Sequence, residues 1–475
     1  MSNWVTLTLT FVSLFVSNYM MGKSINTSFK LLWITIIMAF PIFGGLFYLL
    51  LKQQTSVKRF ENSFFREESR GKEFFEMNNL CLSKNEMPKE HKLQIEYLQN
   101  KTGFPVYKNT KTKYLTPGEV KFKKLVEILE SAEKYIFLEY FIISDGILWQ
   151  KVLEILKQKA SQGLEVRIIY DDIGCFLSFP KDYPKKLERM GIKAAIFNPF
   201  GPFLNATQNN RDHRKIAIVD GKSAITGGIN LADEYINSIK KYGNHWKDSA
   251  ILLEGAAAWS FTIMFLQMWN ICKKTNEDYK KFYPWSEKNT YILEKGYVQP
   301  FSDNPLDSEA TGKNVYLQII NNAKKYVYIN TPYLIIDDSM IAALSLAAKS
   351  GVDVRIVTPY YGDKFYVQML TRSYYKELTE SGIKIYEYAE GFIHSKTFVS
   401  DDKVATVGTT NLDYRSFYLS FECGVNLYET SSIKEIHEDF VNTLFKCKRI
   451  MPEDYNFGIL TRISQNFLRL LSPLF

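Results

Sequence analysis

Cysteine and histidine are both scarce in this chain of 475 residues, which contains five of each. The number of cysteines is odd and no two have the C-x-x-C spacing, so the sequence argues against a disulfide framework and against a zinc knuckle. Isolated thiols in a reducing compartment are the simpler interpretation. The cysteines are Cys81, Cys175, Cys272, Cys423 and Cys447.

The chain also has too little hydrophobic sequence for many membrane spans, as its mean hydropathy of -0.18 indicates. That value excludes a multi-spanning transporter, although it allows a few membrane spans attached to a soluble body. Hydrophobic residues make up 46% and charged residues 23%, which suits two or three folded domains and not a disordered chain. A formal net charge of +8 favours an anionic partner, such as a phospholipid, a nucleic acid or a phosphorylated substrate.

Two stretches without charge lie near the N-terminus. Trp4–Met21 is 18 residues long but contains several threonines and serines, and a signal peptide is the alternative interpretation for it. Leu31–Leu51 is the stronger candidate, because its 21 residues are enough to cross about 30 Å of hydrocarbon. The sequence therefore predicts an N-terminal transmembrane helix pair within residues 1–52.

Basic residues follow the second stretch closely, whereas the connection between the two stretches carries only two lysines. The positive-inside rule then places the large C-terminal body in the cytoplasm. These residues predict a multi-pass protein of the cell membrane with a cytoplasmic body. The basic residues after the second stretch are Lys52, Lys58, Arg59, Arg66, Arg70 and Lys72.

Strand and helix patterns alternate from about residue 115. Tyr135–Ile143 and Val166–Tyr170 have the pattern of buried strands, with an amphipathic helix between them. The same order recurs around strands Tyr326–Asn330 and Val354–Thr358, and the segments "GLEVRIIYDD" and "GVDVRIVTPY" are visibly related. The pattern predicts an internal duplication of two α/β halves with largely parallel sheets.

The C-terminal segment has apolar residues at helical spacing, two arginines and no acidic residue. A helix lying on an anionic membrane surface and a helix packed on the protein's own core both fit this pattern. The expected organisation is two membrane spans in 1–52, a juxtamembrane connector with short helices in 53–114, the first half in 115–290, the second half in 291–455 and an amphipathic helix in 456–475.

Two of the five histidines begin the same pattern. In each case a lysine follows two positions after the histidine, an aspartate seven positions after it and an asparagine seventeen positions after it. The first set is His213, Lys215, Asp220 and Asn230, and the second is His394, Lys396, Asp401 and Asn411. The remaining histidines, His91, His245 and His437, are expected to be ordinary structural residues.

The spacing has a physical meaning if an apolar strand follows each histidine. Residues two apart on a strand share a face, so His213 and Lys215 are expected to project together. The aspartate has the opposite parity and falls near the end of the strand, so we expect it to bond the backbone at the turn. The asparagine follows the next glycine, from where its amide can return to the histidine.

Bringing the two halves together would place two imidazoles, two ammonium groups and two amides around one point. Such a site suits a phosphodiester, because cations and amide donors hold the non-bridging oxygens while one histidine attacks phosphorus and the other protonates the leaving alkoxide. A metal site is the competing interpretation, but a lysine beside each histidine repels a metal ion. We therefore expect no cofactor and no metal.

A catalytic imidazole needs an acceptor that orients its second nitrogen. Glu422, in "LSFECGVN", and Asp248, in "HWKDSAILLEG", are the candidates, with an ordinary ion pair as the alternative interpretation for each. The predicted catalytic set is thus His213, Lys215, Asp220, His394, Lys396 and Asp401, with Asn230 and Asn411 on the phosphate and Asp248 and Glu422 behind the histidines.

The doubled H-x-K-x4-D pattern, each copy followed by G-x-x-N, resembles the phospholipase D superfamily from about residue 115 to 455. Within it the chain is most similar to the bacterial cardiolipin synthases, through segments such as "FPIFGGLFYLLL", "LEYFIISDG", "RDHRKIAIVDG", "TPYLIIDD" and "GTTNLDYRSFYLSFE". This resemblance implies transfer of a phosphatidyl group between two phosphatidylglycerols, with release of glycerol. It also implies that His213 is the nucleophile, which the near-symmetric sequence alone cannot decide.

Two alternatives remain open at this point. The first is a hydrolase, either a phospholipase D or a nuclease, that passes the same intermediate to water. A nuclease has no need of membrane spans, so the expected partners are phosphatidylglycerol and anionic membrane lipid and not nucleic acid. The second is a non-catalytic membrane scaffold with an inactive phosphodiesterase fold, against which the intact motifs argue. The sequence leaves the oligomeric state open.

Overall fold

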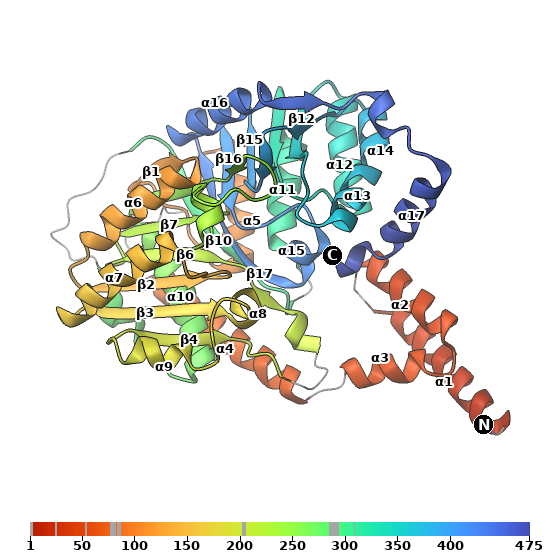
Figure 1. The fold of residues 1–475 in the computed structure, drawn as a ribbon, viewed down its shortest axis with the longest axis horizontal. Helices are drawn as coiled ribbons and strands as arrows, with labels where there is room; N and C mark the ends of the chain where they lie inside the picture. Colours follow the sequence, from red (N-terminus) through yellow and green to blue (C-terminus); the bar gives the residue numbers. More distant parts are fainter. Residues whose placement is uncertain are drawn as a thin grey trace.

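The computed structural model contains two α/β halves packed side by side, coloured from orange to green and from cyan to blue in Figure 1. Cys81 lies outside the residues that the structure describes. Those residues are 3–23, 26–52, 55–76, 82, 87–201, 206–284, 294–307 and 309–475.

The first half contains a seven-stranded sheet in the order β1-β9-β7-β6-β2-β3-β4. Only the β2–β3 and β3–β4 pairs are parallel, so the expectation of a largely parallel sheet is wrong. The tight turn at Asp220 and Gly221 joins β6 to β7, and a connection so short permits only antiparallel pairing. The strands are β1 (Thr110–Leu115), β2 (Tyr135–Tyr140), β3 (Glu165–Asp171), β4 (Lys193–Phe197), β6 (Lys215–Val219), β7 (Ser223–Gly227) and β9 (Ala250–Gly255).

The second half repeats this arrangement. Its main path runs β10-β17-β16-β15-β11-β12-β13-β18, with β11, β12 and β13 parallel, as β2, β3 and β4 are in the first half. The predicted duplication is therefore confirmed. The strands are β10 (Tyr297–Asp303), β11 (Tyr326–Asn330), β12 (Asp353–Pro359), β13 (Lys384–Tyr388), β15 (Thr397–Ser400), β16 (Val404–Gly408), β17 (Ser420–Tyr428) and β18 (Cys447–Arg449).

A single apolar core joins the two halves. It combines first-half residues such as Phe137 and Ile251 with second-half residues such as Val399 and Phe421, all of them fully enclosed. Separate clusters lie under the outer helices of each half. Those helices are α6 (Gly118–Glu130), α7 (Ile147–Ser161) and α9 (Tyr183–Glu188) in the first half, and α11 (Thr311–Asn322), α12 (Asp338–Lys349) and α14 (Tyr375–Glu380) in the second, while α10 (Ala258–Lys273) and α16 (Ser432–Leu444) contribute to the shared core.

The segment expected to be a connector of short helices is more structured than predicted. It contains α4 (Thr55–Glu76), a helix of 22 residues that packs along α10, where Asn270 Nδ2 donates to Glu67 Oε2 at 2.9 Å. A shorter helix, α5 (Lys92–Thr102), follows. Strand β1 also begins before residue 115 and pairs with β9, so the sheet of the first half includes residues that the sequence analysis left in the connector.

The N-terminal region differs most from expectation, because it contains three helices and not two. These are α1 (Asn3–Met21), α2 (Thr27–Ala39) and α3 (Gly44–Lys52). The predicted second span breaks between α2 and α3, since Pro41 has no N–H for the helix ladder and its ring clashes with the carbonyl four residues earlier. Gly45 then lets α3 approach α1, where an added Cβ would lie 2.9 Å from the Cα of Ser13.

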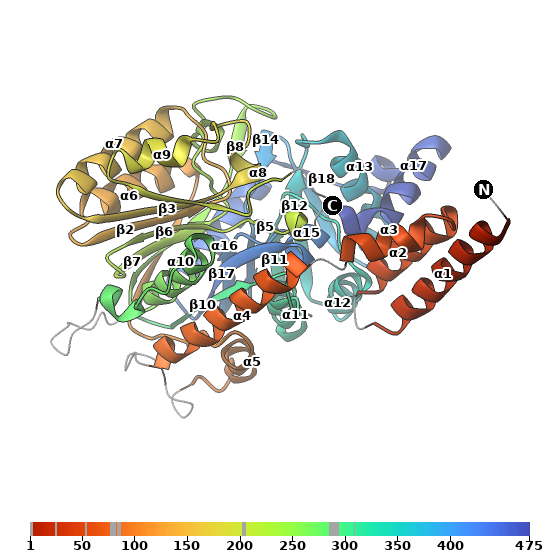
Figure 2. The same ribbon diagram turned by 90° about the horizontal axis from the view of Figure 1, so that it is seen from below.

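The first apolar stretch, and not the second, is therefore the stronger candidate for a membrane span. Within the residues that the structure describes, α1 is the one helix long and apolar enough to cross a membrane, over Trp4–Met21. The multi-pass prediction is not supported. Helix α2 instead packs against the second half. The centroid of the Phe29 ring lies 6.1 Å from that of Tyr414 and 5.8 Å from that of Tyr418. Figures 1 and 2 both place α2 beside the C-terminus, with α1 and α3 packed against α2.

Candidate active site

Two short pairs of parallel strands join the two halves, and each pair positions one of the motif histidines. Strand β5 (Arg211–Asp212) of the first half pairs in parallel with the start of β17 in the second. Strand β14 (Gly391–Ile393) of the second half pairs in parallel with β8 (His245–Lys247) of the first. The next residue continues each ladder, because the N–H of His213 donates to Phe421 O at 3.0 Å and that of His394 donates to Lys247 O at 2.7 Å.

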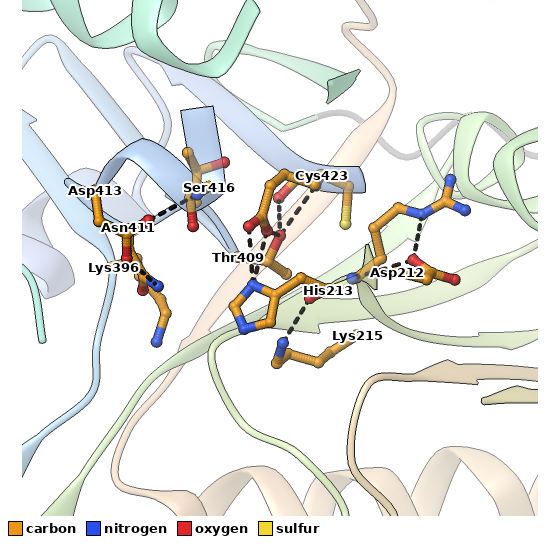
Figure 3. A network of polar contacts seen from close by, with 12 residues as sticks. Asp212, His213, Lys215, Lys396, Thr409, Asn411, Asp413, Ser416 and Cys423 are labelled. Atoms are coloured by element: carbon orange, nitrogen blue, oxygen red, sulfur yellow. Dashed lines mark hydrogen bonds and ion pairs between the residues drawn. The ribbon is translucent and has the colours of Figure 1, made fainter. Parts of the chain in front are cut away.

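Each histidine thereby meets a carboxylate of the opposite half. His213 Nδ1 lies 2.9 and 3.0 Å from the two oxygens of Glu422, and His394 Nδ1 lies 2.7 Å from Asp248 Oδ2. We call these contacts the crossed pairs. An ionised carboxylate accepts the Nδ1–H, which leaves Nε2 with its lone pair free for chemistry. Figure 3 shows that this second nitrogen of His213 lies on the side of Lys215 and Lys396.

Sequence reasoning proposed both carboxylates but missed the groups that hold them. The hydroxyl of Thr409 donates to Glu422 Oε2, and the backbone N–H of Ser249 donates to Asp248 Oδ1 at 2.7 Å. Gly228 occupies the place in the first half that Thr409 has in the second, and an added Cβ there would lie 2.2 Å from Asp248 Oδ1. The sequence contains a signal of this difference, because the first motif has G-G-I-N where the second has G-T-T-N.

The two motif lysines complete the centre of the site. Lys215 Nζ donates to His213 O at 2.5 Å, and Lys396 Nζ donates to His394 O in the same way. Both lysines are buried. The ring of Phe141 forms one wall, since its centroid lies 5.1 Å from that of the His213 ring and 5.4 Å from Lys215 Nζ.

Burial dominates the electrostatics of this cluster. It lowers the pKa of Lys215 to about 8 and that of Lys396 to about 7, and it raises the pKa of Asp248 to about 7 and that of Glu422 to about 8. Because ionised groups lose their hydration here, the site favours a ligand that supplies compensating charge. An anion between the two ammonium groups meets that requirement.

The imidazoles are held in their neutral form. Burial, followed by the charges of Lys215 and Lys396, keeps the pKa of both His213 and His394 well below 6.5. A neutral imidazole with its Nδ1–H donated to a carboxylate presents an unprotonated Nε2, which is the form that can attack phosphorus. A bound phosphodiester adds negative charge, which favours protonation of one of the two rings.

The two motif asparagines lie in the site region but already have protein partners. Asn230 Oδ1 accepts from the N–H of Ile142 at 3.0 Å, and its amide donates to Tyr235 Oη at 2.7 Å. Asn411 Nδ2 donates to Asp413 Oδ2 at 3.0 Å. A side-chain amide has two N–H groups, so each asparagine keeps one donor beyond these bonds.

The motif aspartates bond the backbone. Asp220 accepts the N–H groups of Glu133, Lys134 and Tyr135 at 2.7 to 2.8 Å. Asp401 accepts the equivalent three N–H groups, from Lys324 to Tyr326, at 2.7 to 2.9 Å. This is the arrangement expected from their strand parity, and it fixes the turn behind each His-x-Lys strand to the start of a neighbouring strand.

A buried ion network around the first motif was not predicted. Arg214, between His213 and Lys215, contacts Glu139 Oε1 at 2.5 Å and Asp212 Oδ1 at 3.0 Å. The second half has Ser395 at that position, and its hydroxyl lies 2.5 Å from the hydroxyl of Ser249. The charged Glu139 within the apolar run "YIFLEYF" was the signal in the sequence. The two halves are therefore unequal beside their histidines.

The other three histidines lie outside the crossed pairs. His91 is buried beside Glu90 and Glu429, which is the one group with metal-ligand spacing among the described residues. No residue of the doubled motif belongs to that group. His245 Nδ1 lies 3.0 Å from Tyr388 Oη, and His437 Nδ1 lies 3.0 Å from Asp402 Oδ1.

Comparisons with known proteins agree with the geometry. A family described as "Cardiolipin synthase, PLD-like domain" matches residues 125–258 and 316–444, and one described as "Phospholipase_D-nuclease N-terminal" matches residues 8–53. The first two ranges contain every residue of the doubled motif and both partner carboxylates, Asp248 and Glu422.

Similar whole proteins are found in several bacteria. A cardiolipin synthase of Halalkalibacterium halodurans is 34% identical over 99% of this chain and 93% of its own length, and cardiolipin synthase 2 of Bacillus anthracis is 35% identical over 94% and 87%. An uncharacterized protein of Streptococcus mutans is 43% identical over 96% and 98%. Among solved structures, phosphatidylserine synthase of Haemophilus influenzae superposes with a TM-score of 0.61 at 14% identity, over 82% of this chain and all of its own, which shows a shared fold.

Proposed function

The chain belongs to the cardiolipin synthases with phospholipase D-like domains, and from that premise we propose that it moves a phosphatidyl group from one phosphatidylglycerol to another through a phosphatidyl-histidine intermediate. As a member of this family it is a phosphatidyltransferase. The observation that carries the proposed mechanism is the pair of crossed His–carboxylate contacts beside two buried lysines.

In the first step, Nε2 of His213 attacks the phosphorus of a bound phosphatidylglycerol. The P–N bond forms, the bond from phosphorus to the glycerol oxygen breaks, and protonated His394 gives its Nε2 proton to the departing oxygen. Lys215 and Lys396 hold the charged non-bridging oxygens, assisted by the amides of Asn230 and Asn411. Such preorganised charges stabilise the transition state without rearrangement.

The second step reverses the first with a different alcohol. A hydroxyl of a second phosphatidylglycerol attacks phosphorus, its proton passes to neutral His394, and the P–N bond breaks to free His213. The products are cardiolipin and one molecule of glycerol. Glu422 accepts the Nδ1–H of His213 and so keeps Nε2 unprotonated for attack. Asp248 accepts the Nδ1–H of His394, so that the Nε2 of His394 is the atom that gives and takes the proton.

Burial favours transfer over hydrolysis. His394 is 8% exposed and His213 15% exposed, so few water molecules reach the intermediate. A phospholipase D that hydrolyses the same intermediate is the main alternative. A nuclease fits less well, because α1 is long and apolar enough to anchor the catalytic body to a membrane, and a nuclease has no need of such an anchor.

Glycerol exchange separates these functions. Because one phosphodiester is exchanged for another, the reaction is nearly balanced in energy and runs in both directions. Labelled glycerol supplied in excess with cardiolipin should be incorporated into phosphatidylglycerol, with phosphatidic acid as a minor product. Thin-layer separation and mass spectrometry of the lipids would measure both.

A protein carrying His213→Ala is the matched control for spontaneous exchange. If phosphatidic acid dominates at every glycerol concentration, the enzyme is a hydrolase and the transferase assignment fails.

We also propose that the catalytic body lies on the cytoplasmic side, with α1 as its span. Helix α17 (Ile459–Leu470) supports a second contact with the bilayer. Its buried face packs on the second half through Gln465, whereas its other face exposes Ile459, Leu460, Ile463 and Phe467 by 59 to 81%. The helix therefore packs on the body and still presents an apolar surface of the kind that binds the membrane interface.

Charged substitutions on that surface should weaken action at a membrane. The double substitution Leu460→Asp and Ile463→Asp should lower the rate on phosphatidylglycerol vesicles by about three- to tenfold, because apolar area no longer enters the interface. The rate on substrate dispersed in detergent should stay unchanged. Phe445→Asp, at an 86% exposed site after α16, is the control. Equal vesicle rates for the two variants would contradict the proposal.

A further inference from the structure

One carboxylate oxygen near the site has no partner. Asp363 follows strand β12, and its Oδ2 accepts the hydroxyl of Tyr333 at 2.7 Å. Its other oxygen, Oδ1, is enclosed by protein yet accepts no hydrogen bond from any of the described residues. An enclosed acceptor without a donor is costly, so such an atom is a candidate for contact with a ligand.

Asp363 lies on the side of His394. The ring of Tyr235 lies 5.6 Å from the His394 ring, and the hydroxyl of Tyr235 accepts a hydrogen bond from the amide of Asn230. Burial above all, and then nearby charges that include Asp363, raise the pKa of the Tyr235 hydroxyl. Tyr333, which donates to Asp363, precedes Leu334, and Leu334 pairs with Leu412 next to the motif residue Asn411.

The backbone around Asp363 supports this placement. An added Cβ at Gly243 would lie 3.1 Å from the ring of Tyr361, so the loop that carries Asp363 packs over the segment around Gly243. Three residues farther along that segment, the ring of Trp246 lies 5.4 Å from the ring of His394. The rings of Tyr235 and Trp246 also pack on each other, with their centroids 4.7 Å apart, so these contacts place the loop of Asp363 at one and the same end of the site.

A carboxylate at this end cannot hold the phosphate, because both groups are anionic. It can accept hydroxyl donors, and a glycerol headgroup provides them. In an in-line displacement the alcohol lies opposite the nucleophile, so with His213 attacking, both the leaving and the entering alcohol lie beside His394. In each case the carbon beside the one that bears the reacting oxygen carries a further hydroxyl.

We propose that Asp363 Oδ1 binds the hydroxyl next to the reacting oxygen of the glycerol headgroup, in the leaving alcohol and in the acceptor alike. This inference rests on the proposed transferase function and names the feature of the alcohol that the site selects. Tyr333 orients the carboxylate through Oδ2. Alcohols without a neighbouring hydroxyl do not gain from this contact.

Competition between two alcohols tests the proposal on the full chain in detergent with phosphatidylglycerol. Labelled glycerol would form labelled phosphatidylglycerol, and 1-propanol, which has the same carbon chain without the extra hydroxyls, would form phosphatidylpropanol. Asp363→Asn keeps the shape of the side chain but removes the charge. It should reduce the preference for glycerol over 1-propanol by about tenfold or more, the loss expected when a hydrogen bond to a charged acceptor is weakened.

The ratio of the two products is independent of how much enzyme is folded. Asp182→Asn, at an exposed residue whose side chain caps no helix, should leave the ratio unchanged. If Asp363→Asn lowers both products equally, or neither, Asp363 does not recognise the alcohol and the inference is wrong. If the wild-type enzyme itself forms neither product and releases only phosphatidic acid, the transferase function fails instead.

Discussion

Alanine at either His213 or His394 should abolish phosphatidyl transfer while the fold and membrane association persist. One imidazole cannot act as nucleophile and as acid on opposite sides of phosphorus, and the loss of one acid–base group alone costs roughly 10²–10⁴-fold. Lipid mass spectrometry with phosphatidylglycerol vesicles would measure the loss. Near-normal cardiolipin formation by either variant would rule out the two-histidine mechanism.

A substrate with a good leaving group separates the two roles. A p-nitrophenyl phosphodiester releases p-nitrophenolate without needing a proton, so His394→Ala should still release one equivalent of it per active site. The intermediate should then accumulate as a phosphorylated His213, detectable by mass spectrometry, because no base activates the acceptor. His213→Ala should release none. The reverse pattern would make His394 the nucleophile.

The crossed pairs lead to the second large expected effect. Glu422→Gln should lower phosphatidyl transfer by about 10²–10⁴-fold, because an amide can donate to Nδ1 and so favour the tautomer in which Nε2 is protonated. Asp248→Asn should cause a similar loss by acting on His394. Both variants keep the volume of the side chain, so the core around each carboxylate stays filled.

The p-nitrophenyl substrate shows which histidine each carboxylate serves. Glu422→Gln should lose the release of p-nitrophenolate together with lipid transfer, although Glu422 is near His394 in sequence. Asp248→Asn should keep the release and lose lipid transfer. Should the two variants exchange these behaviours, each carboxylate would act on the histidine of its own half, against the contacts of 2.7 to 3.0 Å seen here.

The features predicted well from sequence are those that depend on local pattern. The strand at Tyr326–Asn330 was predicted to the residue, and its counterpart at Tyr135 was predicted only three residues too long. His213 and Lys215 are two positions apart, so in an extended segment their side chains share a face, and this does not depend on the rest of the fold. The same parity indicated that Asp220 faces away, and its three backbone bonds agree with that.

The features that were missed depend on contacts between distant residues. His213 and Glu422 are 209 positions apart, and His394 and Asp248 are 146 positions apart, so no local pattern shows which pairs with which. The sheet was predicted as largely parallel because hydrophobic runs do not reveal strand direction. For the N-terminal helices, composition favoured 31–51 as a span, but the helix break at Pro41 outweighed the apolar side chains.

The parallel ladders between β5 and β17 and between β14 and β8 also bear on how the chain is synthesised. A ribosome completes the first half before any residue of the second exists, and that half contains His213 without Glu422. In the proposed mechanism this nascent domain contains the nucleophile without the carboxylate that orients it. We therefore expect transfer activity to begin only when Ser420–Glu422 has been translated and has docked against Arg211–Asp212.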